Sequence, residues 1–267
     1  MAEATAAPAI VVHHLEKTYL SQNRDGSYTE THALSDINLT VTPGEFICII
    51  GASGCGKSTL LRIIAGFESL SSGEMLVMGK TIAGPGPDRG MVFQDYALFP
   101  WLSVAQNIAY GPRQKGLPKT EIASRTERYI EMVGLTKFRN RYPHELSGGM
   151  RQRVAIARVL ANDSSVILMD EPFGALDAIT RDGLQKSLLQ IWEQARKTIL
   201  FVTHSVDEAV SLADRVIVLS PHPGRLKLEL KIDLPRPRDI ASVEFNTLKR
   251  TMLDAIAPDV AAEEEAA

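Results

Sequence analysis

A glycine-rich stretch between a buried strand and a helix constrains this chain more than any other feature. Residues 51–58 read Gly-Ala-Ser-Gly-Cys-Gly-Lys-Ser and fit the pattern GxxxxGK[ST]. Residues 45–50 before it are apolar on both faces, as in a buried parallel strand, and residues 59–65 have a helical pattern. This context is the one that the pattern requires, so we set aside an ordinary glycine-rich turn.

Such a stretch predicts a cradle for phosphate groups. Glycines let successive backbone N–H groups point into one concavity at a helix N-terminus, where phosphate oxygens bind. Lys57 adds a positive charge for the β- and γ-phosphates of a nucleotide, and Ser58 supplies a hydroxyl ligand for Mg²⁺.

The rest of the chain predicts an α/β fold. Residues 166–169 and 198–202 are also apolar on both faces, and helical stretches follow them, so we expect a parallel sheet with right-handed crossovers. Further elements are predicted as strands at 10–19, 37–41, 215–219 and 226–232, a polar loop at 21–30 turning at Asp25-Gly26, a helix at 242–256, and a frayed tail at 263–265.

The buried-strand signal stops between about residues 95 and 161. Helical patterns such as 121–133 and 149–160 replace it, which predicts a helical lobe inserted into the core. We therefore expect one α/β domain over 10–240 with this lobe inside it, followed by a C-terminal helix and tail over 241–267.

Composition excludes several classes of protein. Hydrophobic residues make up 45% and charged residues 23%, as in ordinary globular proteins. The net charge of −3 gives no basic field, so we expect no nucleic-acid partner. Cys48 and Cys55 cannot build a disulfide framework. No signal peptide or membrane-spanning run is evident, so any membrane role must come through a partner.

Polar residues follow the other two buried strands. Asp170 and Glu171 end one strand, at the sheet edge where ligands of open α/β sheets bind. Asp170 can hold Mg²⁺ and Glu171 can reach an attacking water, whereas without the cradle the pair would be a solvated turn. His204 ends the third strand and, taken alone, would be structural. Ser205 begins an S-x-x-E capping box, so we give it no catalytic part.

A second anion site is predicted at a helix start. Ser147, Gly148 and Gly149 precede a helix whose small or apolar positions Met150, Val154, Ala157 and Ala161 share one face. Ser147 can be a simple N-cap. Two glycines after a cap weaken a helix start, however, unless a ligand or another backbone must come close.

Together these motifs resemble those of ABC transporter ATPase subunits, in order and in spacing, over nearly the whole chain. The matches are Tyr19 (A-loop), Gly51, Ser53, Gly54, Cys55, Gly56, Lys57, Ser58 and Thr59 (Walker A), Gln94 (Q-loop), residues 146–152 (signature), Asp170 and Glu171 (Walker B and catalytic glutamate), residues 175–177 with Asp177 (D-loop), and His204 (switch).

The resemblance implies a P-loop NTPase core with a parallel sheet, an antiparallel β subdomain and an inserted helical lobe. It implies ATP as ligand, with Mg²⁺ held by Ser58, Gln94 and Asp170, and catalysis by Glu171, His204, Gln94 and Lys57. Two ATP molecules would lie in a head-to-tail homodimer, each between one cradle and the partner's Ser147 and Gly149.

The partners implied are transmembrane permease subunits and, indirectly, an extracytoplasmic solute-binding protein, with this chain on the cytoplasmic face of the inner (plasma) membrane. Residues 79–89, 98–101 and 172–182 are similar to the nitrate, sulfonate and taurine importer branch, taurine importers most of all. The polar segment 21–31 departs from that branch.

Two other classes of P-loop protein fit the sequence less well. An ABC-type ATPase acting on DNA or ribosomes would carry long coiled-coil insertions or a second such domain, and neither is present. A P-loop kinase or switch would leave the signature stretch and His204 unexplained.

Overall fold

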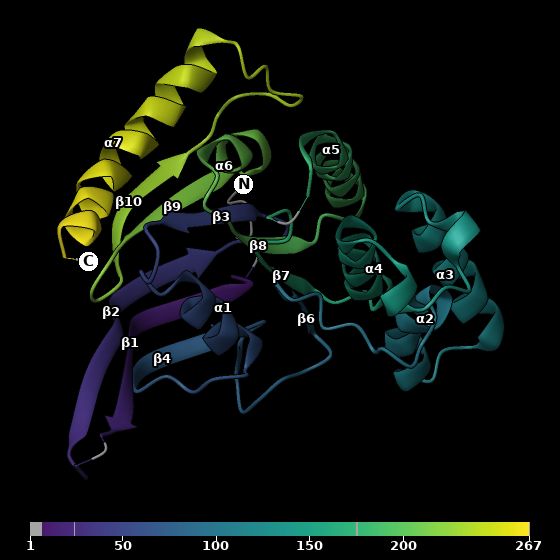
Figure 1. Ribbon diagram of the computed structural model, residues 1–267, viewed down its shortest axis with the longest axis horizontal. Helices are drawn as coiled ribbons and strands as arrows, with labels where there is room; N and C mark the ends of the chain where they lie inside the picture. The colour runs from purple at the N-terminus through teal and green to yellow at the C-terminus, as the bar shows by residue number, and fades with distance from the viewer. Residues whose placement is uncertain (1–6, 24, 175, 267) are drawn as a thin grey trace, which may run out of the picture. The chain divides into compact units, whose positions relative to one another are not determined.

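The computed structural model describes residues 7–23, 25–174 and 176–266, the side chains of 258–266 excepted (Figure 1). Internal contacts divide the chain into two compact units. One comprises the described parts of Met1–Gly86 and Thr198–Ala267, and the other is Pro87–Lys197.

The first unit contains an antiparallel sheet in the order β2-β1-β4-β5. Its strands are β1 (Ile10–Gln22), β2 (Tyr28–Val41), β4 (Ser72–Val77) and β5 (Lys80–Thr81). This sheet confirms the expected antiparallel β subdomain.

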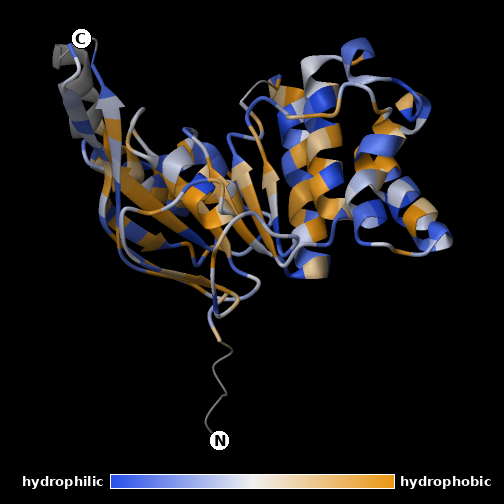
Figure 2. Cartoon of the chain, turned by 90° about the horizontal axis from the view of Figure 1, so that it is seen from below, coloured by the Kyte–Doolittle hydropathy of each residue, from blue (hydrophilic) through white to orange (hydrophobic). Residues whose placement is uncertain are grey.

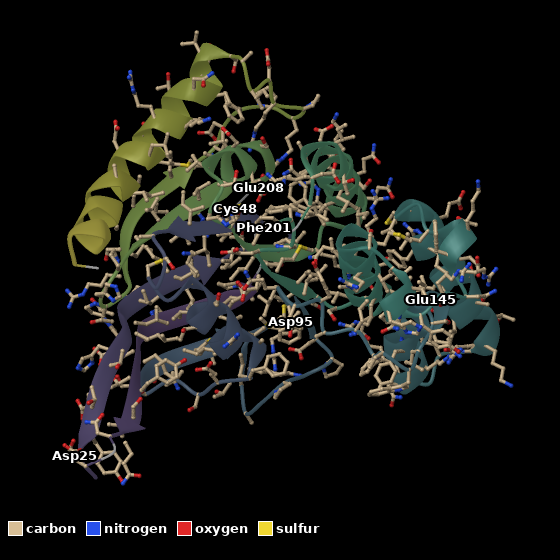
Figure 3. The ribbon with its side chains drawn as sticks, in the orientation of Figure 1. Asp25, Cys48, Asp95, Glu145, Phe201 and Glu208 are labelled. Atoms are coloured by element: carbon tan, nitrogen blue, oxygen red, sulfur yellow. The ribbon has the colours of Figure 1, made fainter. Side chains whose placement is uncertain are left out.

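The hairpin of β1 and β2 corrects the loop predicted at 21–30. Leu20 pairs with Glu30 and Gln22 with Tyr28, so residues 21–22 and 28–30, half of that segment, are strand. Both faces are exposed here, and an exposed ladder leaves no hydrophobic alternation to detect. The predicted turn lies at the tip, where the Asp25 carboxylate accepts hydrogen bonds from the Ser27 N–H at 3.0 Å and hydroxyl at 2.6 Å (Figure 3).

The first unit also holds two of the three predicted buried strands. β3 (Phe46–Gly51) lies between β8 (Thr198–Val202) and β9 (Arg215–Ser220), parallel to both, and β10 (Arg225–Lys231) is antiparallel to β9. Every residue of β3 and β8 is buried, and Cys48 pairs with Phe201 across them (Figure 3).

Three helices complete this unit: α1 (Lys57–Ala65), α6 (Val206–Leu212) and α7 (Val243–Ala266). The prediction that the last helix ends at 256 is wrong, since α7 continues to Ala266 through the predicted tail. The alanine- and glutamate-rich sequence there has high helix propensity, which sustains the helix.

The second unit combines a parallel strand pair, β6 (Arg89–Val92) and β7 (Val166–Asp170), with helices. The helices are α2 (Val104–Gln114), α3 (Lys119–Met132), α4 (Gly148–Ala161) and α5 (Ala178–Ala195), with short 3₁₀ turns at Thr136–Phe138 and Pro143–Glu145. The unit extends beyond the predicted lobe because β6 pairs with β7 and also contacts α4.

Helices α2, α3 and α4 share one apolar core. Figure 2 shows hydrophobic residues along these helices, interleaved with hydrophilic ones. The predicted face of α4 is confirmed, since Val154, Ala157 and Ala161 are buried in this core and Met150 packs against it. No helix in the described part of the chain is long and apolar enough to cross a membrane.

Candidate functional site

The predicted phosphate cradle joins β3 to α1 in the first unit. Glycine is required sterically at two of its positions. Gly51 has φ +151°, and a Cβ there would lie 2.5 Å from the Leu219 carbonyl oxygen. Gly56 has φ +88°, and its Cβ would lie 2.5 Å from Leu34 Cδ2. Neither position can hold a side chain without displacing its surroundings.

Lys57 begins α1 and is buried in the cradle. Its Nζ donates hydrogen bonds to the carbonyl oxygens of Gly51 at 2.9 Å and Ala52 at 2.7 Å. Burial raises the pKa of the neighbouring Cys55 thiol, which therefore stays neutral at physiological pH. α1 has no side-chain N-cap at Gly56, so no side chain fills its N-terminus.

The other cradle residues take two environments. Ser53 and Gly54 are exposed, whereas Ser58 and Thr59 are half-buried in the first turn of α1. Tyr19, near the end of β1, is half-buried, and Thr59 lies near enough to its hydroxyl to act on its pKa, so the structure brings the predicted base-stacking ring beside the cradle.

His204 follows β8 and is exposed. Because β8 runs parallel to β3, with Val202 beside Ile49, His204 and the cradle lie at the same carboxyl edge of these strands. This is the edge at which ligands of open α/β sheets bind.

The capping box predicted at Ser205 is half right. Ser205 caps α6, since its hydroxyl accepts from the Glu208 N–H at 3.3 Å. The reciprocal bond is replaced: the Glu208 carboxylate accepts from the Thr203 hydroxyl at 2.6 Å, and the Ser205 N–H donates to that hydroxyl oxygen at 3.0 Å.

In the second unit, the predicted carboxylates end β7. Asp170 is 4% exposed, and Glu171 has φ +45°, a left-handed conformation that is uncommon for a non-glycine residue. The Gln94 amide donates a long hydrogen bond of 3.5 Å to the Glu171 carboxylate. Two of the predicted catalytic residues thus meet, although 77 positions separate them.

The signature stretch begins α4. Ser147 is the predicted N-cap, its hydroxyl accepting from the Met150 N–H at 3.3 Å. Other side chains of this unit pack closely against the two glycines. A Cβ at Gly149 would lie 3.1 Å from Leu176 Cδ2, and one at Gly148 would lie 3.3 Å from the Tyr96 hydroxyl. Packing within this unit therefore favours small residues here, in addition to any ligand.

Asp177 caps α5 by accepting from the Thr180 N–H at 3.0 Å, and this hydrogen bond lowers the pKa of Asp177. Ala175 of the same predicted loop lies outside the described residues.

Sequence reasoning missed two contacts at the cradle. Glu68 accepts a hydrogen bond from the Tyr19 hydroxyl, and the turn after β9 packs on the cradle at Gly224, where a Cβ would lie 2.2 Å from the Cys55 carbonyl oxygen. Both contacts join segments far apart in the chain, so no local pattern reveals them.

Comparison with known proteins defines the class. The ABC transporter family matches residues 34–174. An uncharacterized ABC transporter ATP-binding protein of Methanocaldococcus jannaschii is 54% identical, covering 85% of each chain. The chain therefore belongs to the ABC transporter ATP-binding family, and it is an ATP hydrolase of that class.

Two relatives whose names give a transported solute are similar to this chain within the ABC transporter family. A nitrate import ATP-binding protein of a Synechocystis strain is 48% identical over 89% of each chain. A taurine import ATP-binding protein of Roseobacter denitrificans is 47% identical over 84% of this chain and 86% of its own. An ATP-binding cassette solved as a dimer with ADP and Pi is 31% identical, with a TM-score of 0.75 over 85% of this chain and 100% of its own.

Proposed function

We propose that this chain hydrolyses ATP to drive uptake of a small anionic or zwitterionic solute of the taurine, sulfonate or nitrate type through a partner permease. The observation that carries the proposal is the identity of 47–48% to taurine and nitrate import ATP-binding proteins over most of the chain. These relatives favour transport over an ATPase acting on DNA or ribosomes.

In the first unit, the cradle residues would hold the ATP phosphates. Glycine backbone N–H groups and the N-terminus of α1 suit phosphate oxygens, and Lys57 is already placed there as a cation. Tyr19 would stack on the adenine, and His204 at the same strand edge would contact the γ-phosphate.

In the second unit, Glu171 would orient or deprotonate the attacking water, with Gln94 beside it. Mg²⁺ would be held by Ser58, Asp170 and Gln94. These donors are hydroxyl, carboxylate and amide oxygens, which Mg²⁺ prefers together with substrate phosphates.

Two copies would share each nucleotide. Ser147, Gly149 and Asp177 of one copy would face the cradle of the other. Dimeric structures of related ATP-binding cassettes, 31% and 32% identical to this chain, support this proposal. The assembly would lie on the cytoplasmic face of the inner membrane through its permease, with a solute-binding protein acting from the other side.

The test is uptake in cells. The gene is deleted, and uptake of radiolabelled taurine, an alkanesulfonate and nitrate is measured with wild-type or Glu171→Gln protein supplied in trans. We expect one solute to lose uptake on deletion and to regain it only with the wild type.

Normal uptake of all three solutes in the deletion strain would contradict the proposed branch. Copurification with ribosomes or DNA instead of a membrane permease would contradict transport altogether.

A further inference from the structure

Tyr19 is held at both its tip and one face. Its hydroxyl donates a hydrogen bond to Glu68, which lies just beyond the C-terminal end of α1, 49 positions away in the chain. Lys17 Nζ lies 4.7 Å from the centroid of the Tyr19 ring. An aromatic ring fixed in this way retains little freedom about its side-chain torsions.

Glu68 is itself fixed by cations. Lys17 Nζ lies 3.7 Å from one of its carboxylate oxygens, and Arg62 Nη1 lies 3.9 Å from the other. Lys17 also donates to the Ser69 carbonyl oxygen at 2.7 Å. The Glu68 side chain is only 21% exposed, so these contacts are partly shielded from water.

The contacts tie the ring to the helix that carries the cradle. α1 begins at Lys57 and ends shortly before Glu68, and Thr59 in its first turn lies near enough to the Tyr19 hydroxyl to act on its pKa. The ring therefore has a set position relative to the phosphate cradle. Burial, and then the bond to Glu68, raise the pKa of Tyr19, so its phenol remains a proton donor to the carboxylate at neutral pH.

We propose that Glu68 is a positioning residue for nucleotide binding, which holds the Tyr19 ring where its open face stacks on the base of ATP. The proposal rests on the assignment of Tyr19 to the adenine. A preorganised ring loses less conformational freedom when the nucleotide binds, so the contribution of Glu68 should appear in KM and not in kcat.

A double-mutant cycle tests this coupling. A base that stacks on an aromatic side chain loses affinity when that side chain is removed. We therefore expect Tyr19→Ala to raise KM for ATP by on the order of tenfold. We expect Glu68→Ala to raise KM about threefold or more with kcat unchanged, and to add less than twofold in the Tyr19→Ala background. Glu68→Gln, which keeps an acceptor oxygen, should restore most of the affinity.

Two controls separate positioning from folding. Affinity for inorganic tripolyphosphate, which has no base, should be the same in all variants. Tyr19→Phe keeps the ring without its hydroxyl, so it should match Glu68→Ala, and the two together should add nothing. Glu74→Ala removes an exposed carboxylate on β4 and should change neither KM nor the melting temperature.

The measurements distinguish failure of the inference about Glu68 from failure of the assignment of Tyr19 to the adenine. If Tyr19→Ala raises KM but Glu68→Ala does not, or if the two effects add fully, Glu68 does not act through Tyr19 and the inference is overturned. If Tyr19→Ala leaves KM for ATP unchanged, Tyr19 does not contact the base, and both that assignment and the inference fall.

Discussion

Lys57 in the first unit and Glu171 in the second each have a conformation that is fixed by the fold. Lys57 is held by two backbone carbonyl oxygens of its own loop, so its charge lies in the cradle before any phosphate arrives. Glu171 has a strained left-handed backbone, and strain of this kind persists where the surrounding structure enforces it, often at functional sites. Each observation agrees with a residue that is preorganised within its own unit for ATP hydrolysis.

The carboxylate of Glu171 provides the sharpest residue-scale prediction. Glu171→Gln keeps the size and hydrogen-bonding capacity of the side chain but removes its basicity. We expect ATP affinity to stay within about threefold, while turnover falls about 10²- to 10⁴-fold, as for loss of a general base. Fluorescent-nucleotide titration and phosphate release measure the two quantities.

Asp182→Asn is the matched control, since Asp182 is an exposed carboxylate of the same unit paired with Lys186 at 2.7 Å. Turnover of Glu171→Gln close to that of this control would remove Glu171 from the catalytic role.

At the scale of elements, a strand can be predicted from sequence when it is buried, because burial leaves a hydrophobic pattern in its residues. β3, β7 and β8 are buried along their whole length, so all their residues except Thr198 and the strand-ending Asp170 are apolar or glycine, and their ends are clear. The ends of β1 and β2 are exposed, so the hairpin there depends on backbone pairing that leaves no such pattern. The Tyr19–Glu68 and Gln94–Glu171 contacts depend on tertiary folding and are equally invisible.

The segment between β6 and α2 carries aromatic residues and is hydrogen-bonded to α2. Asn107 of α2 is fully buried, and its side chain accepts from the Phe99 N–H at 3.0 Å and donates to the Leu102 carbonyl oxygen at 2.8 Å. Trp101 is 69% exposed, with its ring centroid 5.7 Å from that of Phe99. Bulky apolar groups held in the open are typical of partner sites.

Trp101 is therefore expected to anchor the permease. Because Asn107 fixes the backbone of the loop, Trp101→Ala should leave the melting temperature and the ATPase activity of the isolated subunit near wild type. An anchoring aromatic contributes about 2 kcal/mol or more, so affinity for the permease should fall roughly thirtyfold. Quantitative pull-down of the detergent-solubilised permease measures this loss.

Phe138→Ala, another exposed aromatic of the same unit, is the control and should bind normally. Equal binding by both variants, or a lowered melting temperature for Trp101→Ala alone, would assign Trp101 to the fold and not to the partner surface.

At the scale of the whole molecule, the chain carries two predicted anion sites, each on a helix start in a different compact unit. α1 begins at Lys57 in the first unit, and α4 begins at Gly148 after its cap Ser147 in the second. In a head-to-tail dimer the two kinds of anion site would bind the same nucleotide, since each ATP would lie between the cradle of one copy and the α4 N-terminus of the other.

Mixing two inactive variants tests this shared site. In a homodimer, Lys57→Ala damages both cradles and Ser147→Arg blocks both α4 N-termini. In a heterodimer of the two, one ATP site carries both changes and the other carries neither, so partial ATPase activity should return on mixing. Ser147→Arg also removes the N-cap, which costs about 1 kcal/mol, so a thermal melt must first show that this variant is folded. If differently tagged chains copurify as heterodimers but the mixture stays as inactive as its parents, each nucleotide is served by one chain alone.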